Sequence, residues 1–222
     1  IMMKSSSRDR RAFLRSTAGA LSAPLIALQA KGANDRISMA FIGLGVMGRE
    51  NLQVAMAQKG VAVSAVCDVY QPHLERAGAL ARRAGHQPRE VGDFRRVLED
   101  KSIDAVCVST PDHWHPYITV EACKAGKDVY VEKPAGVYVG EGRKMVAAAR
   151  KYKRIVQAGT WQRSSTHFRE ACEVVRGGEL GAISFCRTWI YSNMARNTLG
   201  SPANAAAPAG LKVTFGVAAL VA

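Results

Sequence analysis

The sequence lacks a long hydrophobic run, because no apolar stretch in its 222 residues approaches the roughly 20 residues of a membrane-spanning helix. An integral membrane protein is therefore not expected. The sequence also lacks a CxxC pair or any other metal-type cysteine spacing. Its five cysteines are odd in number and widely spaced, and several lie in apolar stretches. Buried free thiols are expected rather than a disulfide framework.

Basic residues outnumber acidic ones, with 31 Lys and Arg against 18 Asp and Glu and a formal net charge of +13. Residues 1–31 contain six of these cations and one aspartate, and the remaining excess is spread over many segments. Basic and aromatic residues are not interleaved as on a nucleic-acid-binding face, so no nucleic-acid partner is expected. A hydrophobic content of 48% with 22% charged residues is typical of a globular chain.

Residues 1–33 differ from the rest and are predicted to be an export signal and linker. A basic start leads into an Ala-rich apolar stretch, 18–30, that is too short to remain in a bilayer. The run Asp9-Arg10-Arg11-Ala12-Phe13-Leu14-Arg15 resembles a twin-arginine signal, although Asp9 stands where Ser or Thr is usual. This resemblance implies a periplasmic protein with no membrane association beyond export. The alternative is a disordered basic tail followed by an amphipathic helix.

From residue 37 onward, short β-rich runs alternate with helical patterns, which predicts an α/β fold with a doubly wound parallel sheet over residues 35–160. The strands are nearly continuous apolar runs, as is typical of a sheet buried on both faces. Expected strands are Ile37–Ile42, Val61–Cys67, Ile103–Ser109, Asp128–Val131 and Ile155–Ala158, and expected helices lie near 46–59, 72–84, 93–100, 116–125 and 139–152. A domain change is expected near Thr160, and Ala182–Tyr191 is predicted to be one long strand of a new domain.

A glycine-rich run, Gly43-Leu44-Gly45-Val46-Met47-Gly48, directly follows the first strand and opens a helix. In this context the GxGxxG pattern predicts a dinucleotide-binding turn. Gly43 would permit the tight turn, Gly45 would let the backbone approach a pyrophosphate, and Gly48 would let helix and strand pack closely. The alternative is that the glycines serve only a tight turn between strand and helix.

Other groups around the turn suit the same ligand. The amides of Val46 and Met47 lie at a helix N-terminus, where an anion is favoured. Asp68 closes the second strand, where a carboxylate would accept a hydrogen bond from an adenosine ribose hydroxyl and repel a 2′-phosphate. Because no Arg or Lys occurs at 69–73, NAD is predicted in preference to NADP.

Three further segments complete a family pattern. They are Thr110-Pro111-Asp112-His113-Trp114-His115, Glu132-Lys133-Pro134 and Val156-Gln157-Ala158-Gly159-Thr160-Trp161-Gln162-Arg163. With the glycine-rich run, they occur in the order and spacing of the glucose-fructose oxidoreductase / inositol dehydrogenase / MocA family (Gfo/Idh/MocA). The chain resembles this family over roughly residues 37–192.

The resemblance implies an NAD(P)-dependent oxidoreductase that acts on a sugar, polyol or related small molecule. In that family the lysine of the Glu-Lys-Pro motif lies beside nicotinamide and substrate, so Lys133 would be the catalytic residue and could relay the alcohol proton. Glu132 would support the nicotinamide side. The resemblance places Thr110, Pro111, His115, Glu132, Lys133 and Gln162 at the cofactor, and Lys133, Trp161 and Arg163 at the substrate.

A metal site is a weaker interpretation of the histidine pair. His113 and His115, with Asp112 nearby, could chelate a metal, but no third ligand of suitable spacing is present. Cofactor packing or helix capping is expected instead, and no metal is predicted.

The chain departs from the family after Thr160. About sixty residues follow, and His167, before an expected helix at 168–176, does not match the family's Asp/His pair. Residues 161–211 are predicted to begin an incomplete α+β substrate domain, and 212–222 an aberrant tail of a truncated or frameshifted product. Rival interpretations are a non-catalytic dinucleotide-binding fragment and a family variant that uses NAD transiently in glycoside cleavage. A homo-oligomer is a further expectation.

Overall fold

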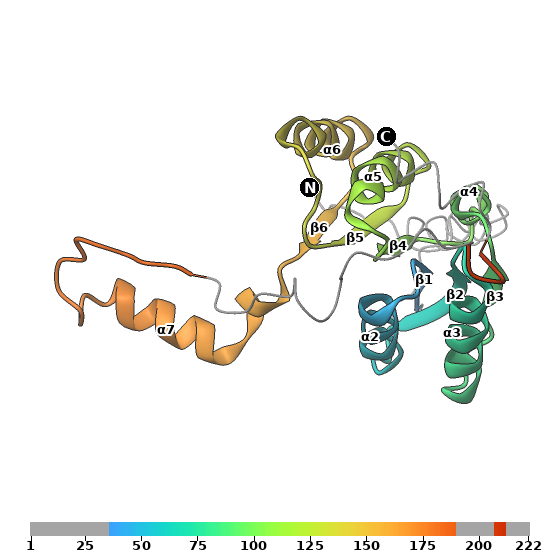
Figure 1. Ribbon diagram of the computed structural model, residues 1–222, viewed down its shortest axis with the longest axis horizontal. Helices are drawn as coiled ribbons and strands as arrows, with labels where there is room; N and C mark the ends of the chain where they lie inside the picture. Colours follow the sequence, from blue (N-terminus) through green and yellow to red (C-terminus); the bar gives the residue numbers. More distant parts are fainter. Residues whose placement is uncertain (1–35, 190–206, 212–222) are drawn as a thin grey trace, which may run out of the picture. The chain divides into compact units, whose positions relative to one another are not determined.

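Six parallel strands form one sheet in the computed structural model, which describes residues 36–189 and 207–211 (Figure 1). The strand order is β3-β2-β1-β4-β5-β6, so the chain reverses direction across the sheet between β1 and β4. This topology confirms the predicted doubly wound sheet. The strands are β1 Ile37–Ile42, β2 Val61–Cys67, β3 Arg89–Val91, β4 Ala105–Val108, β5 Asp128–Glu132 and β6 Val156–Gly159.

Helices cover both faces of the sheet. The first two, α2 and α3, lie on one face, whereas α4, α5 and α6 lie on the other (Figure 1). The helices are α2 Val46–Met56, α3 Gln71–Arg83, α4 Phe94–Glu99, α5 His115–Lys124, α6 Val139–Tyr152 and α7 Thr166–Arg176, with short 3-10 turns η1 Asp112–Trp114 and η2 Trp161–Ser164. None of the helices in these ranges is both long and apolar enough to cross a membrane.

The core is split into two clusters by the alternation of side chains along the central strand. Ala40 and Ile42 of β1 pack with α4, α5 and α6, whereas Phe41 packs with α2 and α3. All three side chains are at most 3% exposed. Burial on both faces explains why the strands read as continuous apolar runs.

The structure differs from the predicted strands in two ways. β3 was not predicted, because it has only three residues and two of them, Arg89 and Glu90, are charged. Conversely, residues 182–189 form no strand, although their composition is β-rich. A strand needs a neighbour to accept its backbone hydrogen bonds, and these residues pair with no strand in the described part of the chain. The export signal (1–33) and the tail (212–222) lie outside the described residues.

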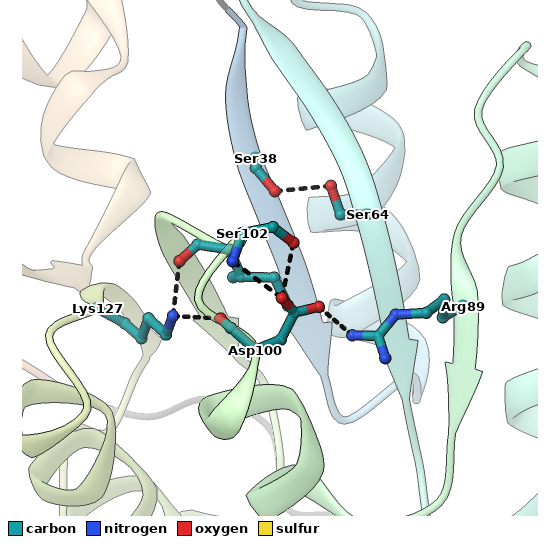
Figure 2. A network of polar contacts seen from close by, with 7 residues as sticks. Ser38, Ser64, Arg89, Asp100, Ser102 and Lys127 are labelled. Carbon is teal, nitrogen blue, oxygen red and sulfur yellow. Dashed lines mark hydrogen bonds and ion pairs between the residues drawn. The ribbon is translucent and has the colours of Figure 1, made fainter. Parts of the chain in front are cut away.

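A buried lysine holds the loop between α4 and β4 (Figure 2). Lys127 is 2% exposed, and its Nζ donates hydrogen bonds to the carbonyl oxygens of Asp100 and Ile103. The Asp100 carboxylate accepts hydrogen bonds from the Ser102 amide and hydroxyl and pairs with Arg89. These hydrogen bonds lower the pKa of Asp100, whereas burial lowers the pKa of Lys127. Through Asp100 and Arg89, the network connects the loop before β4 with the edge strand β3.

Replacing Lys127 with alanine should lower the free energy of unfolding by about 2–3 kcal/mol, because two loop carbonyls lose their buried donor. The matched control is Lys124→Ala, three residues earlier in the chain, because Lys124 is 47% exposed and forms an ion pair with Glu121 at the surface. That change should cost under about 0.5 kcal/mol. Urea denaturation of both variants measures the difference, and equal destabilisation would contradict a structural role for Lys127.

Candidate functional site

The register of the sheet brings the carboxyl ends of four strands to one edge. Ile42 of β1 lies opposite Cys67 of β2 and opposite Val108 of β4, and Val108 lies opposite Val131 of β5. The residues that follow these strands therefore meet beside the switch between β1 and β4. Open α/β sheets bind their ligands at this place.

A cavity of about 720 Å³ occupies this edge. Ten residues that the sequence assigned to a cofactor line it together: Gly43, Gly45, Val46, Met47, Asp68, Thr110, Pro111, His115, Glu132 and Lys133. The glycine-rich turn, Asp68 and the Glu-Lys-Pro segment thus line one continuous cavity. The volume suits a molecule the size of a dinucleotide more than a single small metabolite.

The three glycines of the turn have different surroundings. Gly43 has φ +86°, and a Cβ there would lie 2.6 Å from the backbone of Ser109 and Thr110. At Gly48 a Cβ would lie 1.9 Å from the Gly43 carbonyl oxygen, so only glycine allows this packing. At Gly45, by contrast, no atom of the described residues beyond the chain neighbours lies within 4 Å of an added Cβ. Gly43 and Gly48 are required by the fold of the turn, whereas space is left beside Gly45 for a ligand to approach the backbone.

The amino end of α2 is open to an anion. Gly45 is the N-cap, no side chain in the described part of the chain forms a capping hydrogen bond, and the first turn contains no acidic residue. The first amides of a helix have no partner within the helix, so a phosphate group can accept their hydrogen bonds. These features fit the pyrophosphate of a dinucleotide at Val46 and Met47.

Asp68 is held by the backbone on both sides. Its Oδ2 accepts a hydrogen bond of 2.6 Å from the Leu44 amide, and its Oδ1 accepts one of 2.8 Å from the Tyr70 amide. The ring of His73 lies 3.5 Å from Oδ2. Each carboxylate oxygen can accept a further hydrogen bond. Asp68 is therefore oriented by the turn and can still bind a ribose hydroxyl.

Glu132 is buried beside Lys133 and is oriented by a residue that the sequence analysis missed. Glu132 is 3% exposed; its Oε1 accepts a hydrogen bond of 3.0 Å from Asn51, and its Oε2 accepts one from the Lys133 amide. Asn51 also donates to the Ser109 hydroxyl at 3.2 Å. Its position on the face of α2 toward the strand ends, three residues after Gly48, is the only sequence signal for this role. The Lys133 side chain is exposed along the cavity.

His115 and Thr110 carry polar atoms without a protein partner. The Nδ1 of His115 lies 2.7 Å from the Pro134 carbonyl oxygen, which can only accept, so Nδ1 carries the proton. In the neutral ring Nε2 is then an acceptor. Nε2 and the Thr110 hydroxyl are buried and have no hydrogen-bond partner among the described residues. Both residues line the cavity, and orphaned buried atoms of this kind fit a site that completes its hydrogen bonds with a ligand.

Four predicted residues are not among those that line this cavity. One of them, Gly48, packs against the Gly43 carbonyl oxygen inside the turn. Trp161 is 51% exposed, and Gln162 and Arg163 border a separate hollow against α7. η2 follows β6, the edge strand, whose Gly159 lies opposite Glu132 of β5. The roles that the family resemblance implies for them, Gln162 at the cofactor and Trp161 and Arg163 at the substrate, stay predictions.

The cysteines divide into buried and exposed groups. Cys67, Cys107 and Cys123 are buried, as predicted, whereas Cys172 and Cys186 are exposed. Burial, with a smaller contribution from the Glu132 carboxylate, raises the pKa of Cys107 to about 12. Cys107 therefore stays a thiol throughout the neutral range.

Iodoacetamide at about pH 8 should label Cys172 and Cys186 and leave Cys107 unmodified, because the thiolate is the reactive form and needs access. Raising the pH to about 9 should not increase labelling of Cys107 in the folded chain. Peptide mass spectrometry reads out each site, and full labelling in denaturant is the control. Rapid modification of native Cys107 would contradict the buried position.

The comparisons with known proteins agree with this geometry. A glycosyl hydrolase family 109 protein of Saccharopolyspora erythraea is 32% identical over 159 residues, covering 69% of this chain and 34% of that protein. An inositol 2-dehydrogenase of Salmonella paratyphi B is 28% identical over 142 residues, covering 63% of this chain and 41% of that protein. The crystal structure of myo-inositol 2-dehydrogenase from Lactobacillus plantarum superposes with a TM-score of 0.61 at 27% identity, covering 67% of this chain and 43% of that one.

The chain thus spans less than half the length of these relatives. The family model described as "Oxidoreductase family, NAD-binding Rossmann fold" matches residues 37–160, which include the whole sheet and every strand end around the cavity. With this match over more than half of its length, the chain belongs to the Gfo/Idh/MocA oxidoreductase family, and its sheet is an NAD-binding Rossmann domain.

Proposed function

We propose that the protein is an NAD-dependent dehydrogenase that transfers a hydride between nicotinamide and a hydroxyl carbon of a sugar or polyol. The observation that carries the proposal is the single cavity that joins the glycine-rich turn and Asp68 to Lys133. Two of the relatives above are named inositol dehydrogenases, which supports a polyol as the substrate class.

Residues at different places along the cavity would bind different parts of the cofactor and the substrate. The amides of Val46 and Met47 would bind the pyrophosphate, and Asp68 would bind the adenosine ribose. At the other end, nicotinamide supplies the hydride acceptor when NAD is bound. Lys133 Nζ would take the proton of the substrate hydroxyl as the carbon–hydrogen bond breaks, and Asn51 would hold Glu132 in place beside it.

A panel of sugars and polyols with NAD, followed at the nicotinamide absorbance, tests this proposal. A dehydrogenase should produce NADH in proportion to the substrate consumed, with NAD preferred to NADP. Absence of turnover with every member of the panel, in a preparation that binds NAD, would favour a non-catalytic dinucleotide-binding module.

A second candidate function is glycoside cleavage with transient use of NAD. It is favoured by one observation, the similarity to a glycosyl hydrolase family 109 protein. The two functions differ in their products. A nitrophenyl glycoside would release nitrophenol without net NADH in the second case, whereas a dehydrogenase would accumulate NADH from a free polyol.

We further propose that the protein is exported to the periplasm in its folded state by the pair Arg10 and Arg11. Export of a folded chain suits an enzyme that binds its cofactor in the cytoplasm. Cell fractionation should find the double variant Arg10→Lys, Arg11→Lys retained in the cytoplasm. Unchanged export of this variant would refute the assignment.

A further inference from the structure

A short segment near the end of the described chain docks onto the start of α3. The Gly210 carbonyl oxygen accepts a hydrogen bond of 2.9 Å from the Gln71 amide, and Leu211 forms an isolated antiparallel bridge with Tyr70. Within the segment, the Leu211 amide donates to the Pro208 carbonyl oxygen. Residues that are about 140 positions apart in the sequence are thus joined backbone to backbone.

The contact depends on a glycine. Gly210 has φ +83°, and a Cβ there would lie 3.3 Å from the Gln71 Cβ and from the Pro72 Cδ. Both neighbours belong to the first turn of α3, where the backbone is fixed by the helix. A side chain at position 210 would therefore be strained in conformation and would also push the segment away from α3.

The docked segment also lines the cofactor cavity. Pro208 and Leu211 border it together with Tyr70, His73 and Asp68. The rings of Tyr70 and His73 pack edge to face with centroids 4.9 Å apart. Asp68 marks the adenosine end of the cavity, because the acidic residue after the second strand of this fold binds the adenosine ribose. The adenosine end thus has an apolar wall that comes from outside the Rossmann units.

We propose that Pro208 and Leu211 form one wall of the adenine subsite and bind the face of the adenine ring by apolar contact. The inference rests on NAD occupying this cavity and adds two binding residues that belong neither to the glycine-rich turn nor to the Glu-Lys-Pro segment. Gly210 acts as a positioning residue, since it allows the segment to approach α3. Adenine offers a flat, weakly polar face that apolar side chains recognise well.

Calorimetric titration of the full 222-residue chain with NAD, ADP-ribose and nicotinamide mononucleotide tests this proposal. Leu211→Ala and Gly210→Ala should each weaken binding of NAD and ADP-ribose about tenfold, as expected for the loss of one apolar contact. Binding of nicotinamide mononucleotide should not change. The matched control is Gly178→Ala, because Gly178 also has a positive φ, +82°, but no atom of the residues that the structure describes lies within 4 Å of a Cβ there.

The outcomes separate this inference from the proposed function. Wild-type chain that binds NAD, with Leu211→Ala binding NAD and ADP-ribose equally well, would overturn the adenine wall and leave the function standing. Wild-type chain that binds neither NAD nor ADP-ribose would overturn both. If Gly178→Ala and Gly210→Ala weakened NAD binding equally, backbone strain at a positive φ would explain the effect without any docking of the segment onto α3. That result would also overturn the proposal. Circular dichroism of each variant confirms that the fold is retained.

Discussion

Replacing Gly48 with alanine should lower NAD affinity at least about a hundredfold and destabilise the Rossmann domain by about 2–3 kcal/mol. The added Cβ would lie 1.9 Å from the Gly43 carbonyl oxygen and 2.8 Å from its carbon, and neither backbone atom can yield without opening the turn. Opening the turn moves the Leu44 amide away from Asp68, because the two are joined by a 2.6 Å hydrogen bond. One substitution thus disturbs the pyrophosphate and ribose contacts together.

Gly45→Ala provides the matched comparison for Gly48→Ala. Among the described residues, no atom beyond the chain neighbours lies within 4 Å of a Cβ at position 45, so the free energy of unfolding should fall by no more than about 1 kcal/mol, the cost of alanine at an N-cap. NAD affinity should still fall, because the methyl group would occupy the space through which the pyrophosphate approaches the backbone. Gly142→Ala, on α6 with equally open surroundings, should leave NAD affinity unchanged and raise the free energy of unfolding by about 0.5–1 kcal/mol, because alanine is the better helix former. Normal NAD binding by Gly48→Ala would contradict the role of the turn.

Replacing Lys133 with alanine should lower the turnover number about a thousandfold and leave NAD affinity within about twofold of wild type. Lys133 lines the cavity, and its side chain is exposed there, so its removal creates no buried void. The loss should therefore appear in the chemical step and not in the fold. Steady-state rates with the substrate identified from the panel, together with calorimetric titration of NAD, measure the two effects separately.

Lys144→Ala is the control for Lys133→Ala. Lys144 is an exposed lysine on α6 that does not line the cavity, so its removal changes the net charge by the same amount without touching the site. Turnover by this variant should match wild type. If Lys133→Ala retains full turnover while NAD stays bound, another group moves the hydroxyl proton and the assignment of Lys133 is wrong.

The sheet was largely predictable from the sequence, because strands buried on both faces are continuous apolar runs. The apolar runs of β1 and β4 predicted these strands. β3 could not be predicted, because two of its three residues are charged and the strand is formed only by its pairing with β2. Residues 182–189 show the converse case, in which β-rich composition without a neighbouring strand yields no strand.

The candidate site was predictable where its residues directly follow strands. Asp68 and Thr110 were found in this way, because parallel pairing aligns the strand ends at one edge. Asn51 and Leu211 were missed, since they reach the site from the middle of a helix and from a distant segment. Residues at such positions reach the site only through the packing of helices and loops. No local sequence pattern predicts that packing.

Calorimetric titration of the wild-type chain with NAD and with NADP tests the central claim most directly. The account predicts that one molecule of NAD binds per chain, and that NADP binds at least about tenfold more weakly because the Asp68 carboxylate repels a 2′-phosphate. Asp68→Ala should reduce that preference. Equal affinity of the wild-type chain for both dinucleotides, or no binding of either, would contradict the account.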